Sequence, residues 1–113
     1  MVDISFTYVS CFTVRECIDK LKQSPLHFKF DLFFSRDYEI TTISETKLVI
    51  LFTKGYNLSD HRTEYHATFH ERNGVTYITM KFVSEACGMP VPFVTNYEIT
   101  KLFKERIDAK LVN

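Results

Sequence analysis

Apolar and polar side chains alternate from the start of the chain, where Val2, Ile4, Phe6 and Tyr8 are separated by single polar residues. Successive side chains of a β-strand point to opposite faces, so this period of two is typical of a strand with one face in water. We therefore expect a first strand over residues 2–8. Residues 26–34 carry apolar side chains at the even positions and predict a second strand.

A short helix is predicted between these two strands. Thr13 and Glu16 have the spacing of a capping box, in which each side chain accepts a hydrogen bond from the other residue's backbone N–H. The apolar residues that follow fall on one helical stripe: Val14, Cys17, Ile18 and Leu21. Ser24-Pro25 should end this helix, because the residue before a proline avoids α geometry.

Residues 36–43 and 47–53 predict a β-hairpin around Ser44-Glu45-Thr46. The second of these strands is apolar on both faces, which is typical of a strand at the centre of a sheet. A register in which Ser44 faces Lys47 gives these cross-strand pairs: Ile43–Leu48, Thr42–Val49, Thr41–Ile50 and Ile40–Leu51.

The strongest local signal is Asn73-Gly74, which separates two alternating segments, 63–71 and 75–84. A type I′ turn needs positive φ at both central residues, and Asn-Gly adopts that conformation readily. The turn places Arg72 opposite Val75 and so fixes the register. The expected core pairs are Tyr65–Phe82, Ala67–Met80 and Phe69–Ile78, and the expected outer pairs are His66–Lys81, Thr68–Thr79 and His70–Tyr77.

A second capping-box pattern, Thr95 with Glu98, marks the start of a last helix. Val94 and Ile99 stand at the positions of a hydrophobic staple. The apolar stripe that follows consists of Ile99, Leu102, Phe103, Ile107 and Leu111. We expect this helix to run to about Val112, a length of roughly 25 Å.

These elements predict a single α+β domain over residues 1–113. It consists of an antiparallel sheet of about six strands, a short N-terminal helix and a long C-terminal helix packed on one face. A strand, a helix, a run of hairpins and a closing helix resemble, in their order, the helix-grip fold of the Bet v 1-like, START-like and SRPBCC proteins. The resemblance covers nearly the whole chain. It implies an apolar cavity between sheet and last helix that binds a small hydrophobic ligand, and it carries over no catalytic residue.

Composition narrows the classes of function. The chain has fourteen basic and fourteen acidic residues, and the basic ones are scattered, which argues against a nucleic-acid partner. On the last helix, Lys101, Lys104 and Arg106 mix with acidic residues, a pattern typical of a solvated face. No apolar run approaches the ~20 residues of a membrane span. With no secretory signal and an odd number of cysteines, the sequence predicts a cytoplasmic protein without a membrane partner.

No residue pattern predicts a catalytic, metal or cofactor site. His66 and His70 on one strand would lie about 13 Å apart, too far to share a metal ion. Cys17 is expected in the core, and Cys87 at a strand end as a free thiol. Two polar groups at strand starts could line a pocket mouth: Arg36-Asp37-Tyr38 and Asp60-His61-Arg62.

Eleven Phe and six Tyr residues predict either an aromatic-rich core or the wall of a ligand pocket. The first hypothesis is a non-catalytic module that binds a small hydrophobic ligand between the sheet and the last helix. Its expected lining is Tyr65, Phe69, Met80, Phe82, Ile99 and Phe103. The alternative is a protein-interaction module or homodimer that uses the outer face of the sheet. A third hypothesis, an enzyme of the SRPBCC kind, depends on the resemblance alone.

Overall fold

The structure, a computed structural model, describes residues 4–23, 27–29, 35–54, 62–85 and 96–112. The elements follow the chain in this order: β1 (Ser5–Ser10), α1 (Val14–Gln23), β2 (His27–Lys29), β3 (Ser35–Ser44), β4 (Lys47–Lys54), β5 (Arg62–Arg72), β6 (Val75–Glu85), α2 (Asn96–Ile107) and β7 (Lys110–Leu111). The predicted α+β class is confirmed, and β7 is an addition that the sequence patterns did not predict. Of the second strand, predicted over residues 26–34, the structure describes His27–Lys29 as β2, and residues 26 and 30–34 lie outside the described ranges.

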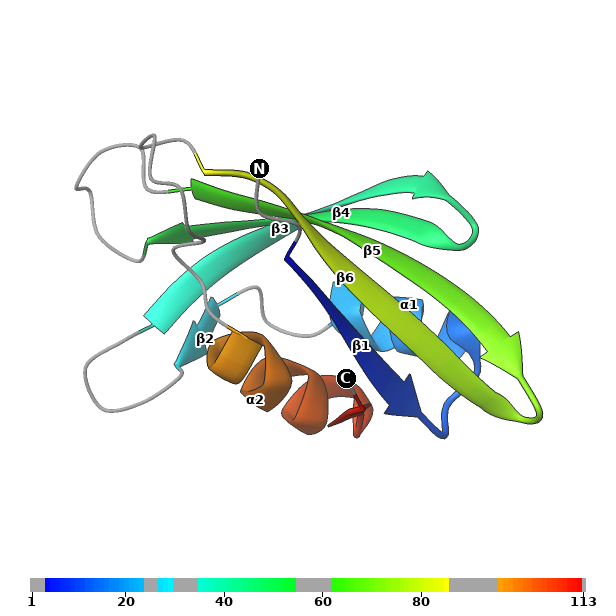
Figure 1. The fold of residues 1–113 in the computed structure, drawn as a ribbon. Coiled ribbons are helices and arrows are strands. Elements are labelled where there is room, and N and C mark those ends of the chain that lie inside the picture. Colours follow the sequence, from blue (N-terminus) through cyan, green and yellow to red (C-terminus); the bar gives the residue numbers. More distant parts are fainter. Residues whose placement is uncertain (1–3, 24–26, 30–34, 55–61, 86–95, 113) are drawn as a thin grey trace.

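The described strands form one antiparallel sheet in the order β2-β3-β4-β5-β6-β1-β7. The sheet curls, and both helices lie on the same side of it (Figure 1). β4 pairs with β3 on one side and β5 on the other, which confirms its predicted central place. β1 lies between β6 and β7, so the first and last strands of the chain are neighbours.

A single core fills the space between the inner face of the sheet and the two helices. Its strand residues include Phe69, Ile78 and Met80, each at most 1% exposed. Its helix residues include the stripes of both helices: Cys17, Ile18, Leu21, Ile99, Leu102, Phe103 and Ile107. Fully burying one such aliphatic or aromatic side chain contributes about 1.5–3 kcal/mol to folding. The β5–β6 residues that were predicted to be buried and the stripe of α2 therefore lie in one shared core.

The hairpin of β5 and β6 has the predicted turn and register. Asn73 has a φ of 54° and Gly74 a φ of 81°, as a type I′ turn requires. Arg72 pairs with Val75, and each predicted core pair and outer pair stands opposite its partner. The register shifts only near the far end, between Glu64 and Tyr65.

The register predicted for the β3–β4 hairpin is wrong beyond its first pair. Ser44 does face Lys47, but Thr42 then faces Leu48 and Ile40 faces Ile50, because the strands are offset at Ile43. This β-bulge leaves Ile43 as the extra residue, 54% exposed, instead of opposite Leu48. The offset places Thr42 and Ile40 opposite Leu48 and Ile50, which are core residues at most 1% exposed.

The first helix begins as the capping box predicts. The Glu16 N–H donates to Thr13 Oγ1, and the Thr13 N–H donates to Glu16 Oε1, both at 3.1 Å. The helix ends at Gln23, and the predicted stop at Ser24-Pro25 lies outside the described ranges. For α2, the start at Asn96 agrees with the prediction, while Val94 and Thr95 are likewise not described.

The last helix is shorter than predicted, because it ends at Ile107 and not near Val112. Asp108 adopts a left-handed conformation with a φ of 51°, and its N–H donates to the Lys104 carbonyl at 3.1 Å. This is the geometry of an αL helix cap. The chain then turns back, and Lys110 and Leu111 pair with Val9 and Tyr8 of β1 as β7.

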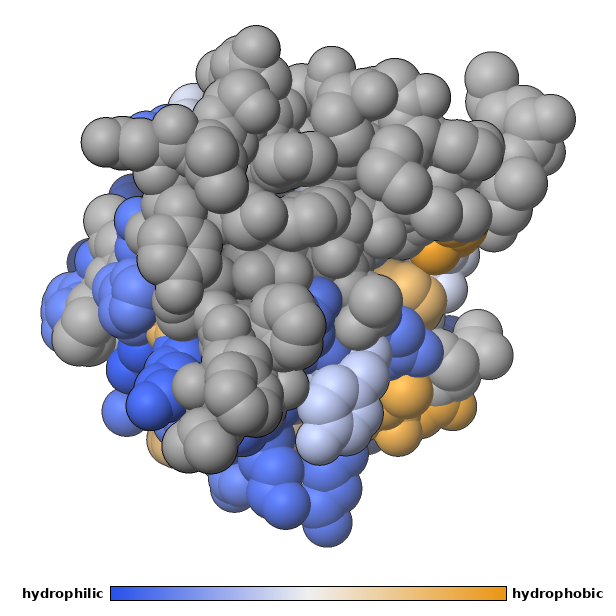
Figure 2. Space-filling view, turned by 90° about the vertical axis from the view of Figure 1, so that its left-hand side faces the viewer, coloured by the Kyte–Doolittle hydropathy of each residue, from blue (hydrophilic) through white to orange (hydrophobic). Residues whose placement is uncertain are grey.

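Neither described helix has the length and apolar character that crossing a lipid bilayer requires. Seen from the left-hand side of Figure 1, hydrophilic residues dominate the lower described surface, and hydrophobic residues gather at one edge (Figure 2). The large hydrophobic side chains that are exposed in the described ranges are Ile43, Val83, Tyr97, Leu111 and Val112.

Candidate functional site

Five aromatic residues on five neighbouring strands form the aromatic cluster: Phe6, Tyr38, Phe52, Tyr65 and Phe82. Tyr65 is its hub, with ring centroids 6.2 Å from Phe6, 6.0 Å from Phe52 and 5.7 Å from Phe82. Tyr38 extends the row, since its ring lies 6.0 Å from that of Phe52. Tilted and edge-to-face ring pairs at these separations add about 0.5–1.5 kcal/mol each beyond their burial.

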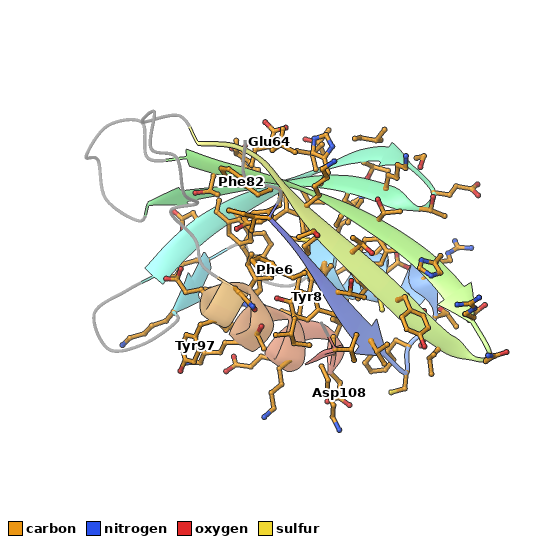
Figure 3. All side chains as sticks on the ribbon, in the orientation of Figure 1. Phe6, Tyr8, Glu64, Phe82, Tyr97 and Asp108 are labelled. Carbon is orange, nitrogen blue, oxygen red and sulfur yellow. The ribbon has the colours of Figure 1, made fainter. Side chains whose placement is uncertain are left out.

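The cluster is closed at its centre and reaches the surface at one end. Tyr38, Phe52 and Tyr65 are at most 1% exposed, whereas Phe6 and Phe82 are half-buried. Figure 3 shows Phe6 and Tyr8 extending from β1 toward the space between the sheet and α2. Tyr8 in turn packs edge-to-face against Phe103 of α2, with ring centroids 4.9 Å apart. The aromatic cluster therefore lies next to core residues that pack against α2.

A polar pair stands at the other end of the cluster, where Tyr38 meets Arg106. The Tyr38 hydroxyl is buried, and its O–H has no hydrogen-bond acceptor within the part of the chain that the structure describes. Burial raises the pKa of Tyr38, and the nearby positive charge of Arg106 and a side-chain hydrogen bond from Arg106 to the Tyr38 oxygen offset this only in part. Tyr38 consequently keeps its proton at neutral pH and remains a hydrogen-bond donor.

Arg106 is held in the last turn of α2 by contacts with β2. Its guanidinium carbon lies 5.2 Å from the centroid of the Phe28 ring, a cation–π contact. Its Nη2 donates to the His27 carbonyl oxygen at 3.4 Å. The prediction that Arg106 belongs to a solvated face is wrong, because the side chain is half-buried against these groups. Arg106 follows Ile99 by seven residues, a spacing that places it on the apolar stripe and could have revealed it.

The polar groups predicted at strand starts are partly described. Asp37 and Tyr38 do lie together in β3, where the Asp37 carboxylate pairs with His27 Nδ1 of β2. Both of these side chains are more than half exposed, so the pair contributes little to stability. Asp60 and His61 lie outside the described ranges.

The six residues predicted to line a ligand site all face the core. Tyr65, Phe69, Met80, Ile99 and Phe103 are at most 1% exposed, and Phe82 is half-buried. The structure brings Tyr65 and Phe82 into ring contact. Phe69 follows Tyr65 by four residues, which places it about 13 Å further along the strand. The six therefore span two ends of the core, and only one end belongs to the aromatic cluster.

None of those six residues lines either of two surface hollows that described residues form. One, of about 550 Å³, lies between the start of α1 and the β3–β4 hairpin, with Val14, Ile18 and Thr42 in its wall. The other, of about 510 Å³, follows the outer side of α2 beside Tyr97, Lys101 and Lys104. Ligand binding by the six predicted residues thus remains a prediction, and it concerns the interior of the protein rather than either hollow.

The described histidines and cysteine that were weighed as possible functional residues make ordinary structural contacts. His66 Nε2 lies 3.0 Å from Glu64 Oε2, and the His70 ring stacks on Tyr77 at 5.4 Å. In the described ranges, no group of three or more His, Cys, Asp or Glu residues could hold a metal ion. Cys17 is buried as predicted, and burial raises the pKa of its thiol. Cys87 is not described.

Comparison with known proteins adds no relative: no family model matches the chain, and no curated protein matches it in sequence.

Proposed function

We propose that this domain is a non-catalytic binding module for a small hydrophobic ligand, which it holds between the sheet and α2 at the aromatic cluster. The observation that carries the proposal is the buried Tyr38 hydroxyl beside the half-buried Arg106. Ligand pockets combine apolar and aromatic walls with a few polar groups that fix orientation. The aromatic cluster, with these two polar side chains at one end, has that composition.

The energetic cost of Tyr38 supports this reading. Arg106 donates to the Tyr38 oxygen, but the buried O–H has no acceptor in the described ranges, and a buried donor left in this state costs about 1–3 kcal/mol. An acceptor on a bound ligand would recover part of that cost. The half-buried Phe6 and Phe82 supply the entry, since their rings reach the surface beside the closed part of the cluster.

A neutral hydrophobic probe tests this function directly. Nile red fluorescence should rise and shift to shorter wavelength on titration with the protein, with one saturable site. Phe82→Ala should weaken that binding by about tenfold, equivalent to ~1.4 kcal/mol, because it removes a ring from the wall. Tyr77→Ala is the matched control, since it removes a ring from the outer face of the same strand, where Tyr77 stacks on His70.

The proposal is wrong if Nile red shows no saturable binding, or if Phe82→Ala and Tyr77→Ala change the affinity equally. Circular dichroism of both variants separates loss of the site from loss of the fold. Phe82→Leu, which keeps an apolar side chain, provides a second test with less disturbance of the core and should bind the probe at an intermediate affinity.

A second candidate function is self-association through the outer face of the sheet. No described element covers that face, since both helices lie on the inner side (Figure 1). Val83 follows the core-facing Phe82 on β6, at the register shift between the Glu64–Ser84 and Tyr65–Phe82 pairs, and is 46% exposed. Light scattering after size exclusion tests this function. A concentration-dependent dimer that Val83→Lys abolishes would support it, and a monomer at every concentration would exclude it.

A further inference from the structure

We propose that a second copy of this chain covers the outer face of β4 and β5, related to the first by a two-fold axis that runs across the strands at Val49. In this arrangement Lys47 of each copy lies over Leu51 of the other. Glu39 and Glu64 then flank the Lys47 ammonium. The inference rests on the second candidate function, self-association, and is independent of the proposed ligand site.

The outer face of β4 carries apolar side chains that no described element covers. β4 is apolar on both faces, a composition typical of a strand that is covered on both sides. Its inner side chains, Leu48 and Ile50, are buried in the core. Val49 and Leu51 point to the outer face, are half-buried, and have both helices on the opposite side of the sheet (Figure 1). The composition of β4 therefore calls for a second layer on its outer side.

Charged residues border these apolar side chains in an asymmetric pattern. Glu39 on β3 and Glu64 on β5 both stand opposite Leu51, one on each side. Figure 3 shows Glu64 on the side of the sheet away from α2. Lys47 lies on the same face of β4, and its two cross-strand neighbours are uncharged. Within the described ranges, neither Lys47 nor Glu39 forms an ion pair, so both charges are available to a partner.

The spacing along β4 makes this pattern self-complementary. Lys47, Val49 and Leu51 point to one face and follow one another at about 6.8 Å, so Val49 lies midway between the other two. A two-fold axis at Val49 that runs across the strands exchanges the positions of Lys47 and Leu51 between the copies. The aliphatic stem of Lys47 then packs on the partner's Leu51, and its ammonium reaches the carboxylates on either side.

The charges also select the direction of the axis. An axis parallel to the strands would place Lys47 against Lys47 and Glu39 against Glu64, so like charges would meet. An axis across the strands brings opposite charges together instead. The chain has no net formal charge, so long-range repulsion does not keep two copies apart. A second copy is therefore the occupant that this face fits.

Sedimentation velocity over a concentration series, at low and at high salt, tests this arrangement. A dimer should form and weaken as salt is raised, because its contacts are partly ionic. Lys47→Glu and Glu39→Lys should each raise the dimer Kd about tenfold, since symmetry introduces every change twice. The double variant, which exchanges the two charges, should associate more tightly than either single variant. Lys110→Glu is the control, because it makes the same charge change in β7, at the edge of the sheet.

The outcomes separate this inference from the function beneath it. A monomer at every concentration overturns self-association and this arrangement together. A dimer that neither single variant weakens leaves self-association standing and overturns the arrangement. The arrangement is also wrong if the double variant associates no better than the single ones, or if Lys110→Glu weakens the dimer as much as Lys47→Glu. Circular dichroism of each variant separates loss of the contact from loss of the fold.

Discussion

Ser10 in β1 donates a 2.7 Å hydrogen bond to the carbonyl oxygen of Ile107, the last residue of α2. The last carbonyls of a helix have no partner inside the helix, so an outside donor must satisfy them. The same hydroxyl oxygen accepts a hydrogen bond from the Phe12 N–H at 3.2 Å. With a side chain only 1% exposed, Ser10 joins the first strand, the turn after it and the end of the last helix.

Replacing Ser10 with Ala should lower the free energy of unfolding by about 1–3 kcal/mol, because it leaves a buried carbonyl without its donor. Urea denaturation followed by circular dichroism measures the change. Ser44→Ala is the control: its hydroxyl accepts a 3.3 Å hydrogen bond in an exposed turn, and we expect a change within about 0.5 kcal/mol. Equal effects at the two serines would contradict the role given to Ser10.

Asp108 holds the conformation that ends α2, and glycine should hold it at lower cost. The left-handed region costs a residue with a Cβ about 1–2 kcal/mol, and a carboxylate at a helix C-terminus also opposes the helix dipole. Asp108→Gly should therefore raise the free energy of unfolding by about 0.5–1 kcal/mol. Asp108→Ala removes the same charge but keeps the Cβ, so it should be less stable than the glycine variant. Two equally stable variants would show that backbone strain at this position is negligible.

The sequence predicted the parts of the fold that local chemistry determines. Asn73-Gly74 requires one turn type, and that turn fixes the register of β5 against β6. Thr13 and Glu16 satisfy each other's N–H groups within four consecutive residues, so their pattern is sufficient to place the start of α1. In these cases no distant residue is needed to decide the structure.

Other features depend on contacts that the local pattern does not contain. The turn after Thr42 has no residue that requires a particular φ, so the bulge at Ile43 reflects how β4 packs and not its own sequence. Asp108 ends α2 although the apolar spacing continues to Leu111, because pairing with β1 draws the chain into β7. From the sequence alone Arg106 is expected on the surface, whereas in the structure it lies beside Phe28 and Tyr38. Of the proposed site, the sequence patterns indicated Tyr65 and Phe82 as lining and Tyr38 at a pocket mouth, and they missed Arg106.

Tyr8 should make the fold sensitive to alkaline pH. Burial raises its pKa from 10.0 to about 12, and its hydroxyl lies 3.1 Å from Thr100 Oγ1. The unfolded chain loses this proton near pH 10 while the folded chain keeps it. The stabilisation from Tyr8 is thus complete below about pH 10 and is lost as pH rises toward about 12, at roughly 1.4 kcal/mol per pH unit.

Urea denaturation across this range measures that slope. Tyr8→Phe should be less stable than the natural chain at neutral pH, because it loses the hydrogen bond with Thr100, but its stability should fall less steeply above about pH 10. Tyr38, whose pKa is also raised by burial, leaves part of the dependence in place. Identical slopes for the natural chain and Tyr8→Phe would show that folding does not change the pKa of Tyr8.

Tyr38→Phe should have the opposite effect on stability from Tyr8→Phe. It removes a buried O–H donor that has no acceptor in the described ranges, so the free energy of unfolding should rise by about 1 kcal/mol. Urea denaturation of the two variants measures the difference. If Tyr38→Phe lowers stability as Tyr8→Phe does, the Tyr38 hydroxyl is a structural group that stabilises the fold through Arg106, and the polar end of the site has no donor to offer.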